Sequence, residues 1–114
     1  MNMKRFFSVD DITNLDTFIQ EAIQLKKTPL QKSELGKGKT LGLVFLNSSL
    51  RTRLSTQKAA QNLGLNTIIL NANQEAWTWE FEDGAIMNGG TVEHIKDAAQ
   101  VLSQYCDIIG IRCF

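Results

Sequence analysis

The sequence predicts an α/β fold in which a parallel sheet is flanked by helices. Three apolar segments of strand length, residues 40–46, 66–70 and 107–111, are separated by segments that have the apolar spacing of helices. A strand, a helix and a second strand form a βαβ unit, whose strands run parallel because the helix returns the chain. Residues 40–46 are a nearly unbroken apolar run, which predicts a strand buried on both faces. We expect the other two strands to be buried as well.

Size and charge restrict the class of protein. The chain has 114 residues, enough for one compact domain, with 12 basic and 12 acidic residues. This balance argues against a general nucleic-acid binder, and no apolar run is long enough to predict a membrane span. Cys106 and Cys113 do not form a metal-binding pattern, so we expect reduced, buried thiols in a cytoplasmic protein. No metal or cofactor is expected.

The N-terminal segment predicts an amphipathic helix that follows Asp10 and Asp11 and ends before Pro29. Its apolar positions fall close to one helical stripe: Ile12, Leu15, Phe18, Ile19, Ala22, Ile23 and Leu25. Residues 30–39 contain two glycines and three lysines and predict an exposed loop.

The most informative stretch lies where the first strand passes into its helix. Asn47, Ser48 and Ser49 fill the turn, and Arg51 and Arg53 fall in the first turn of a helix predicted over residues 50–63. A helix start offers unpaired N–H groups and a partial positive charge, and guanidinium groups suit phosphate or carboxylate oxygens. The stretch therefore predicts an anion site without a metal ligand or a Walker lysine.

Two helices are expected to pack on the sheet. The packed side of the first is predicted to consist of Thr52, Thr56, Ala59, Ala60 and Leu63, and Gly64 is expected to stop it. The second is expected to be capped by Thr91, with a buried face of Ile95, Ala98, Ala99, Leu102 and Tyr105. His94, the single histidine, is interpreted as structural rather than catalytic.

Residues 71–90 form a long connection between the second strand and the last helix. Trp77, Trp79 and Phe81 alternate with polar residues, which allows a short strand. Two interpretations remain open, because such aromatics can pack on their own domain or on another subunit.

The carboxyl ends of parallel strands meet at one edge of a sheet, where ligands bind. The anion site follows the first strand, the Trp77 loop follows the second, and Arg112 follows the third. We therefore expect these three positions to converge. The alternative for Arg112 is a surface arginine or an internal salt bridge, because an arginine at the end of an apolar strand needs a partner or solvent.

Ser49-Leu50-Arg51-Thr52-Arg53 resembles the Ser-Thr-Arg-Thr-Arg motif of the aspartate/ornithine carbamoyltransferases, with Leu50 in place of threonine. With Phe45 and Asn47, the context is most similar to the N-acetylornithine and N-succinylornithine carbamoyltransferase branch. The resemblance covers nearly all of the chain. It implies that residues 1–114 are a partial N-terminal carbamoyl-phosphate-binding domain, without the second domain, which binds the amino acid.

The resemblance also implies roles for individual residues. It assigns carbamoyl phosphate binding to six positions: Ser49, Leu50, Arg51, Thr52, Trp77 and Arg112. Backbone N–H groups of residues 50–52 and the Arg51 side chain would hold the phosphate, while Thr52 and Arg112 would polarise the carbonyl oxygen. Arg53 would brace the site. At the place of Val92, the branch carries an acidic residue for acetylornithine or proline for succinylornithine, so the missing acidic group favours N-succinylornithine.

The expected activity is transfer of a carbamoyl group from carbamoyl phosphate to the side-chain amine of an N-acylornithine, in arginine biosynthesis. The resemblance implies a homotrimer whose Trp77 loop reaches the neighbouring subunit, with Trp79 as the competing candidate. The His-Pro-x-Gln motif of the family is expected beyond residue 114, so this chain alone is expected to be inactive. The alternatives are ornithine or aspartate carbamoyltransferase, or a non-catalytic module that binds phosphate or another subunit.

Overall fold

The structure is a computed structural model that describes residues 5–72, 79–84 and 93–114. The chain divides into two compact units, Met1–Gln31 and Lys32–Phe114, which are described separately. Trp77, Thr91 and Val92 lie outside the described residues.

The first unit contains a short 3-10 helix, η1 (Val9–Asp11), and the helix α1 (Leu15–Lys27). The helix begins later than the sequence predicted, because the Asn14 side chain caps it by accepting the Thr17 N–H at 3.0 Å. Asp11 instead closes a capping box with Ser8 around η1. The end of α1 before Pro29 is confirmed.

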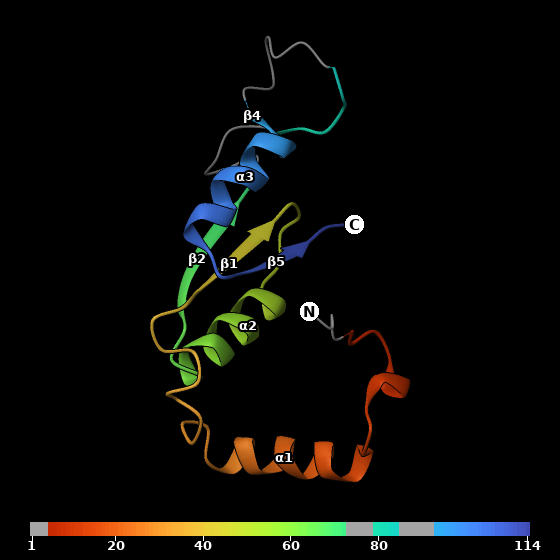
Figure 1. Cartoon of the computed structure of the whole chain (residues 1–114), viewed down its shortest axis with the longest axis vertical. Helices are drawn as coiled ribbons and strands as arrows, with labels where there is room; N and C mark the ends of the chain where they lie inside the picture. Colours follow the sequence, from red (N-terminus) through yellow and green to blue (C-terminus); the bar gives the residue numbers. More distant parts are fainter. Residues whose placement is uncertain (1–4, 73–78, 85–92) are drawn as a thin grey trace. The chain divides into compact units, whose positions relative to one another are not determined.

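The second unit contains the predicted sheet. In chain order its elements are β1 (Thr40–Phe45), α2 (Arg51–Asn62), β2 (Asn66–Asn71), β3 (Trp79–Glu80), β4 (Glu93–His94), α3 (Ile95–Tyr105) and β5 (Ile108–Arg112). The order in the main sheet is β2-β1-β5, and β1 pairs with both neighbours in parallel. Figure 1 shows the arrows of β1 and β5 pointing the same way. The α/β fold with a parallel sheet and flanking helices is confirmed.

The core lies on both faces of β1, because alternate residues of a strand point to opposite faces. One cluster joins Leu41, Leu43 and Phe45 to Ala60 of α2. A second cluster is made by residues of β1, the segment after β2, β3 and α3: Val44, Ala72, Trp79 and Ala98. The helices α2 and α3 therefore cover opposite faces of the sheet, and the prediction that this strand is buried on both faces is confirmed.

The prediction that the other two strands are buried is wrong for this unit. β5 leaves Ile108, Ile109 and Ile111 exposed, and β2 has two exposed and four half-buried positions. Both are edge strands among the described residues, so each pairs with a single neighbour. On α3 the expected buried face is narrower than predicted, since Ala99 and Tyr105 are exposed. Of the two free cysteines, Cys106 is half-buried and Cys113 is exposed, so burial of Cys113 was wrongly predicted.

The predicted stop of α2 at Gly64 is confirmed. Gly64 has a φ of 83°, and its N–H donates to the Gln61 carbonyl while the Leu65 N–H donates to the Ala60 carbonyl. These two bonds form a Schellman motif, which needs a residue in the left-handed region. The preceding loop lies close by, because the Gly36 N–H donates to the Leu63 carbonyl at 2.8 Å.

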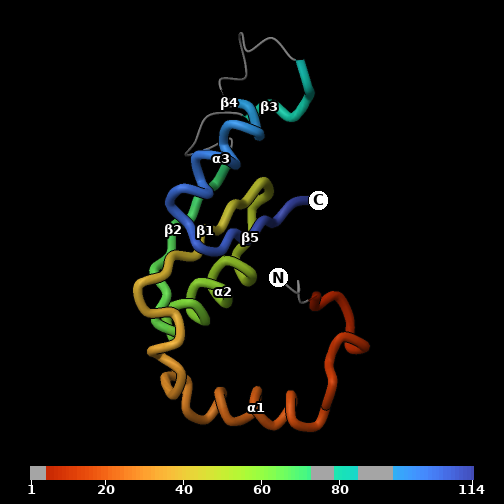
Figure 2. The backbone as a smooth tube through the Cα atoms, in the orientation of Figure 1, coloured from red at the N-terminus to blue at the C-terminus, as the bar shows by residue number. Residues whose placement is uncertain are grey.

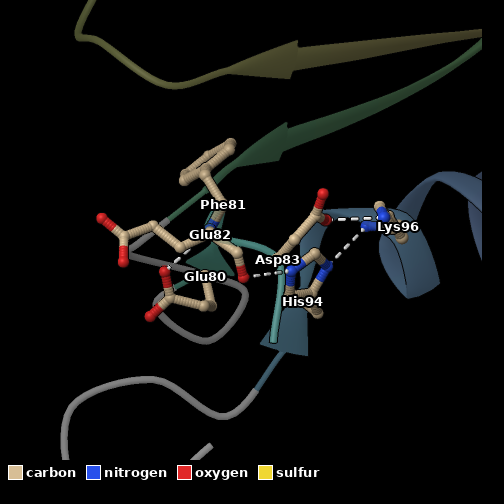
Figure 3. Close-up of polar contacts among 6 residues, drawn as sticks. All are labelled: Glu80, Phe81, Glu82, Asp83, His94 and Lys96. Carbon is tan, nitrogen blue, oxygen red and sulfur yellow. Dashed lines mark hydrogen bonds and ion pairs between the residues drawn. The ribbon is translucent and has the colours of Figure 1, made fainter. Parts of the chain in front are cut away.

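The start of α3 differs from the prediction, because His94 rather than Thr91 is its N-cap. The His94 Nδ1 accepts the Lys96 N–H at 3.1 Å, and Nε2 lies 2.9 Å from the Glu82 carbonyl oxygen (Figure 3). The Lys96 ammonium also pairs with Asp83 at 2.6 Å. Both ring nitrogens thus contact backbone groups, which confirms the structural interpretation of His94. Through these contacts α3 holds residues 82–83.

No helix within the described ranges is long and apolar enough to cross a membrane.

Candidate functional site

The candidate site begins where β1 and β5 end side by side. Arg112 is in register with Phe45, and the Leu46 N–H donates to the Arg112 carbonyl at 3.0 Å, one residue beyond β1. Figure 2 shows the backbone of β5 following β1 to the C-terminus. After β1 the chain continues to β2 on one side, whereas β5 lies on the other, so this is the switch point of the sheet. Ligands of open parallel sheets bind at such points.

The start of α2 lies directly at this edge. Leu50 is the N-cap of α2 and makes no side-chain hydrogen bond to the first turn. The first N–H groups of a helix have no partner within the helix, so an anion can accept from them here. Ser49 is half-buried just before the cap, and Arg51 is exposed at the first helical position. This end of α2 therefore has the backbone and side-chain donors that the sequence predicted.

Arg112 connects the end of β5 with the start of α2. Its Nη1 donates to the Thr52 Oγ1 at 2.8 Å, in a partly buried contact. Its Nε is buried and has no hydrogen-bond partner in the described part of the chain. The Phe114 ring lies 4.9 Å from the guanidinium carbon. A buried donor without a partner costs free energy, so the arrangement suits a ligand that accepts a hydrogen bond.

A hollow of about 190 Å³ lies beside this pair of residues. Its polar lining comes from Thr52, Thr56 and Arg112, and the rest is supplied by β1 and β5. Thr52 and Thr56 lie one turn apart on α2, which explains why both face the sheet. The hollow thus has an apolar floor and a rim that carries hydroxyl and guanidinium groups.

The predicted convergence holds for two of its three members. The anion site and Arg112 meet at one edge of the sheet, since Thr52 and Arg112 are hydrogen-bonded. The third member, Trp77, lies outside the described residues, as does Val92. Arg53 is half-buried on α2, and Leu50 is 71% exposed. The alternative of a surface arginine does not describe Arg112, because its guanidinium is partly buried at the helix start.

Of the two tryptophans that the sequence left as alternatives, Trp79 is among the described residues and Trp77 is not. Trp79 is only 6% exposed and packs with Val44, Ala72 and Ala98 in the core. Trp79 thus packs on its own domain. A tryptophan held in this way is not available to another chain, so of the two tryptophans only Trp77 is left for the interface interpretation.

Two contacts at the site were not predicted. The Phe114 ring stacks on the Arg112 guanidinium, and the Phe114 N–H donates to the Asn47 Oδ1 at 3.0 Å. The sequence offered Asn47 only as part of a motif. Its partner could not be inferred, because Asn47 and Phe114 are brought together by the register of β1 and β5.

The site can hold an anion and stabilise a growing negative charge. Helix N–H groups, the Arg112 guanidinium and the Thr52 hydroxyl are donors near one edge of the sheet, and Arg51 is the first residue of the same helix. Donors fixed before a reaction are effective in stabilising charge that develops in the transition state. Among the described residues, no group of three or more histidine, cysteine or acidic side chains could hold a metal ion.

Comparison with known proteins gives matches over nearly the whole chain. The family model described as "Aspartate/ornithine carbamoyltransferase, carbamoyl-P binding domain" matches residues 4–114. N-succinylornithine carbamoyltransferase from Bacteroides fragilis is 53% identical over 112 residues, which are 98% of this chain and 35% of the relative. N-acetylornithine carbamoyltransferase from Xanthomonas campestris is 41% identical over 116 residues, covering 100% of this chain and 34% of the relative. The chain thus spans about a third of the length of these relatives.

Solved structures give a matching result. Acetylornithine transcarbamylase complexed with acetylcitrulline has a TM-score of 0.78 and 38% identity, covering 98% of this chain and 34% of the other. A glutamate-to-valine mutant of N-acetyl-L-ornithine transcarbamylase, complexed with carbamyl phosphate and N-succinyl-L-norvaline, has a TM-score of 0.78 and 39% identity. This match likewise covers 98% of this chain and 34% of the chain of the mutant.

Proposed function

Since the chain belongs to the aspartate/ornithine carbamoyltransferase family, we propose that it is the carbamoyl-phosphate-binding part of an N-acylornithine carbamoyltransferase. In this reaction the side-chain amine of the acceptor attacks the carbonyl carbon of carbamoyl phosphate. The C–O bond to phosphate breaks, the amine loses a proton, and N-acylcitrulline and phosphate are formed. The observation that carries the proposal is the Arg112–Thr52 hydrogen bond at the start of α2.

The donors at the sheet edge fit the charges of this reaction. Backbone N–H groups of residues 50–52 and the Arg51 side chain bind the phosphate, with Ser49 adding a hydroxyl. Thr52 and Arg112 polarise the carbonyl oxygen, where negative charge grows during attack. The buried Arg112 Nε supports this role, since it offers a donor that a bound oxygen can use. Arg53 braces the site from α2.

An acylated acceptor is favoured by the relatives. The chain is 53% identical to an N-succinylornithine carbamoyltransferase, against 41% for an N-acetylornithine carbamoyltransferase. Val92 lacks the acidic group that would repel a succinyl carboxylate. Several structural relatives solved with N-succinyl-L-norvaline are mutants in which one glutamate is replaced by valine, proline, serine or alanine, which supports a residue without an acidic group beside this ligand. We therefore favour N-succinylornithine over N-acetylornithine.

The proposed assembly is a cytoplasmic homotrimer that serves arginine biosynthesis. In it, the Trp77 loop reaches the carbamoyl phosphate site of the neighbouring subunit. The burial of Trp79 in its own core supports Trp77 as the residue that does so.

The test is a chimera in which this chain replaces the matching third of N-succinylornithine carbamoyltransferase from Bacteroides fragilis. Carbamoyl transfer from carbamoyl phosphate is measured with N-succinylornithine, N-acetylornithine, ornithine and aspartate. We expect the chimera to use an N-acylornithine at a rate near that of the unaltered relative. The relative itself, assayed in parallel, shows that the remaining two thirds are competent.

The acceptor choice needs a separate variant, because most of the acceptor site is supplied by the relative. Val92→Glu in the chimera is expected to raise the ratio of N-acetylornithine to N-succinylornithine turnover by at least tenfold, since it adds a charge that repels the succinyl group. An unchanged ratio would show that residue 92 does not influence the choice of acceptor. A folded chimera that binds carbamoyl phosphate but transfers nothing would instead favour a non-catalytic phosphate-binding module.

A further inference from the structure

The side chain of Asn47 extends the contact between β1 and β5 beyond the end of the sheet. Within the ladder, β1 and β5 are paired up to Phe45 and Arg112. The Leu46 N–H then donates to the Arg112 carbonyl at 3.0 Å, and the Phe114 N–H donates to the Asn47 Oδ1 at 3.0 Å. The amide oxygen of a side chain thus takes the place of the next backbone carbonyl.

This contact lies between the two segments that carry the site. Asn47 belongs to the loop that leads from β1 to α2, and Phe114 lies two residues beyond Arg112. The Phe114 ring in turn lies 4.9 Å from the Arg112 guanidinium carbon. The Nη1 of the same guanidinium donates to the Thr52 Oγ1. Arg112 is therefore held both by its own hydrogen bond and by a residue that Asn47 fixes.

We infer that Asn47 is a positioning residue, which holds residues 112–114 against the start of α2 so that the Arg112 guanidinium stays at the anion site. The inference rests on the proposed function for its ligand, and it extends that function to a residue that touches no substrate. Among the described elements β5 pairs with β1 alone, and the Asn47–Phe114 hydrogen bond continues this one pairing past the last ladder position. Without the Asn47 amide oxygen, the Arg112 guanidinium keeps only its own hydrogen bond to Thr52 and is held less firmly at the anion site.

The first test measures the tether in the whole 114-residue chain by NMR, without any ligand. Asn47→Leu has nearly the same size but no acceptor, and Asn47→Asp restores an acceptor oxygen. We expect the Phe114 amide to exchange about tenfold faster in Asn47→Leu than in the unaltered chain, and Asn47→Asp to restore slow exchange. The Arg112 Nε–H signal should move to the position of a solvated arginine in Asn47→Leu only. Asn66→Leu, at an exposed position of β2, is the matched control and should change neither signal.

The second test asks whether Asn47 acts through Arg112. Inorganic phosphate is titrated into the unaltered chain, Asn47→Leu, Arg112→Ala and the double variant. We expect Asn47→Leu to weaken phosphate binding about threefold to tenfold when Arg112 is present. In the Arg112→Ala background, the same substitution should have no effect. An equal loss in both backgrounds would overturn the inference, because it would mean that Asn47 contributes without Arg112.

The outcomes separate this inference from the proposed function. If the Phe114 amide exchanges equally fast with and without the Asn47 amide, the tether is wrong, whatever the phosphate affinity. If slow exchange and the Arg112 signal depend on Asn47 but no variant binds phosphate, the tether stands and the proposed function fails.

Discussion

At the scale of single residues, the site depends on how the donors of one arginine are used. Arg112 gives one N–H to Thr52 and keeps a buried Nε without a partner in the described part of the chain. A structural arginine in a protein interior has its donors paired, because each unpaired buried donor is costly. Under the proposed function, bound carbamoyl phosphate supplies the acceptor that Arg112 Nε lacks.

Removing this side chain should therefore affect the reaction more than the fold. Arg112→Ala in the chimera is expected to lower kcat by about 10²–10³, the loss typical of one preorganised donor to a developing oxyanion. Steady-state kinetics with carbamoyl phosphate and N-succinylornithine provide the measurement. Lys58→Ala, at an exposed position of α2, is the control and should keep the unaltered rate. A rate for Arg112→Ala within a few-fold of the unaltered chimera would count against the assignment.

At the scale of elements, the two ends of α2 lie at opposite edges of the sheet, and the end away from the site is fixed by a glycine. The end of α2 is fixed by Gly64 in the left-handed region, where the chain turns toward β2. An added Cβ at Gly64 would overlap the Ser33 carbonyl oxygen, which belongs to the loop before β1. The loop, the helix end and β2 are thus packed together at the edge of the sheet opposite the site.

Two glycines have similar φ angles but different surroundings. Alanine substitutions at the two positions therefore separate the cost of the backbone angle from the cost of close packing. Gly64 and Gly84 have φ values of 83° and 73°, but an added Cβ at Gly84 would meet no atom within 4 Å. Gly84→Ala should lower the free energy of unfolding by about 1 kcal/mol, the cost of the left-handed region. Gly64→Ala should cost about 1–3 kcal/mol more, because of the overlap. Denaturant unfolding gives both values, and equal losses would contradict the packing described for Gly64.

At the scale of the whole molecule, the chain spans about a third of the length of its relatives. We propose that its donors bind the phosphate and the carbonyl oxygen of carbamoyl phosphate, and we assign none of these donors to the acylornithine. The proposed transfer reaction would then need further protein around the same edge of the sheet.

The isolated chain should accordingly bind an anion without catalysing transfer. We expect inorganic phosphate or carbamoyl phosphate to shift the backbone amide signals of residues 50–52, with an affinity that weakens as salt increases. Arg51→Ala should weaken this binding several-fold, and N-acylcitrulline should not form above the uncatalysed rate. Carbamoyl transfer by the isolated chain would contradict this expectation.

Much of the fold could be predicted because it depends on local patterns. The apolar run of β1 and the glycine after α2 each act within a few residues of themselves. The cap of α3 was missed because His94, which caps the helix through the Lys96 N–H, is also held by the Glu82 carbonyl. Glu82 belongs to another segment, so the local sequence does not reveal this contact. The exposure of β2 and β5 was missed because an apolar sequence does not reveal that a strand lies at an edge.

The sequence by itself determined the parallel α/β fold and the place of the proposed anion site at the start of α2, since strand periodicity and the chemistry of a helix start are local properties. Only the tertiary structure decided that Arg112 reaches Thr52, that Asn47 holds Phe114, and that Trp79 belongs to the core. Each of these depends on the register and order of strands far apart in the chain. That register follows from the packing of the whole sheet, which no short stretch of sequence contains.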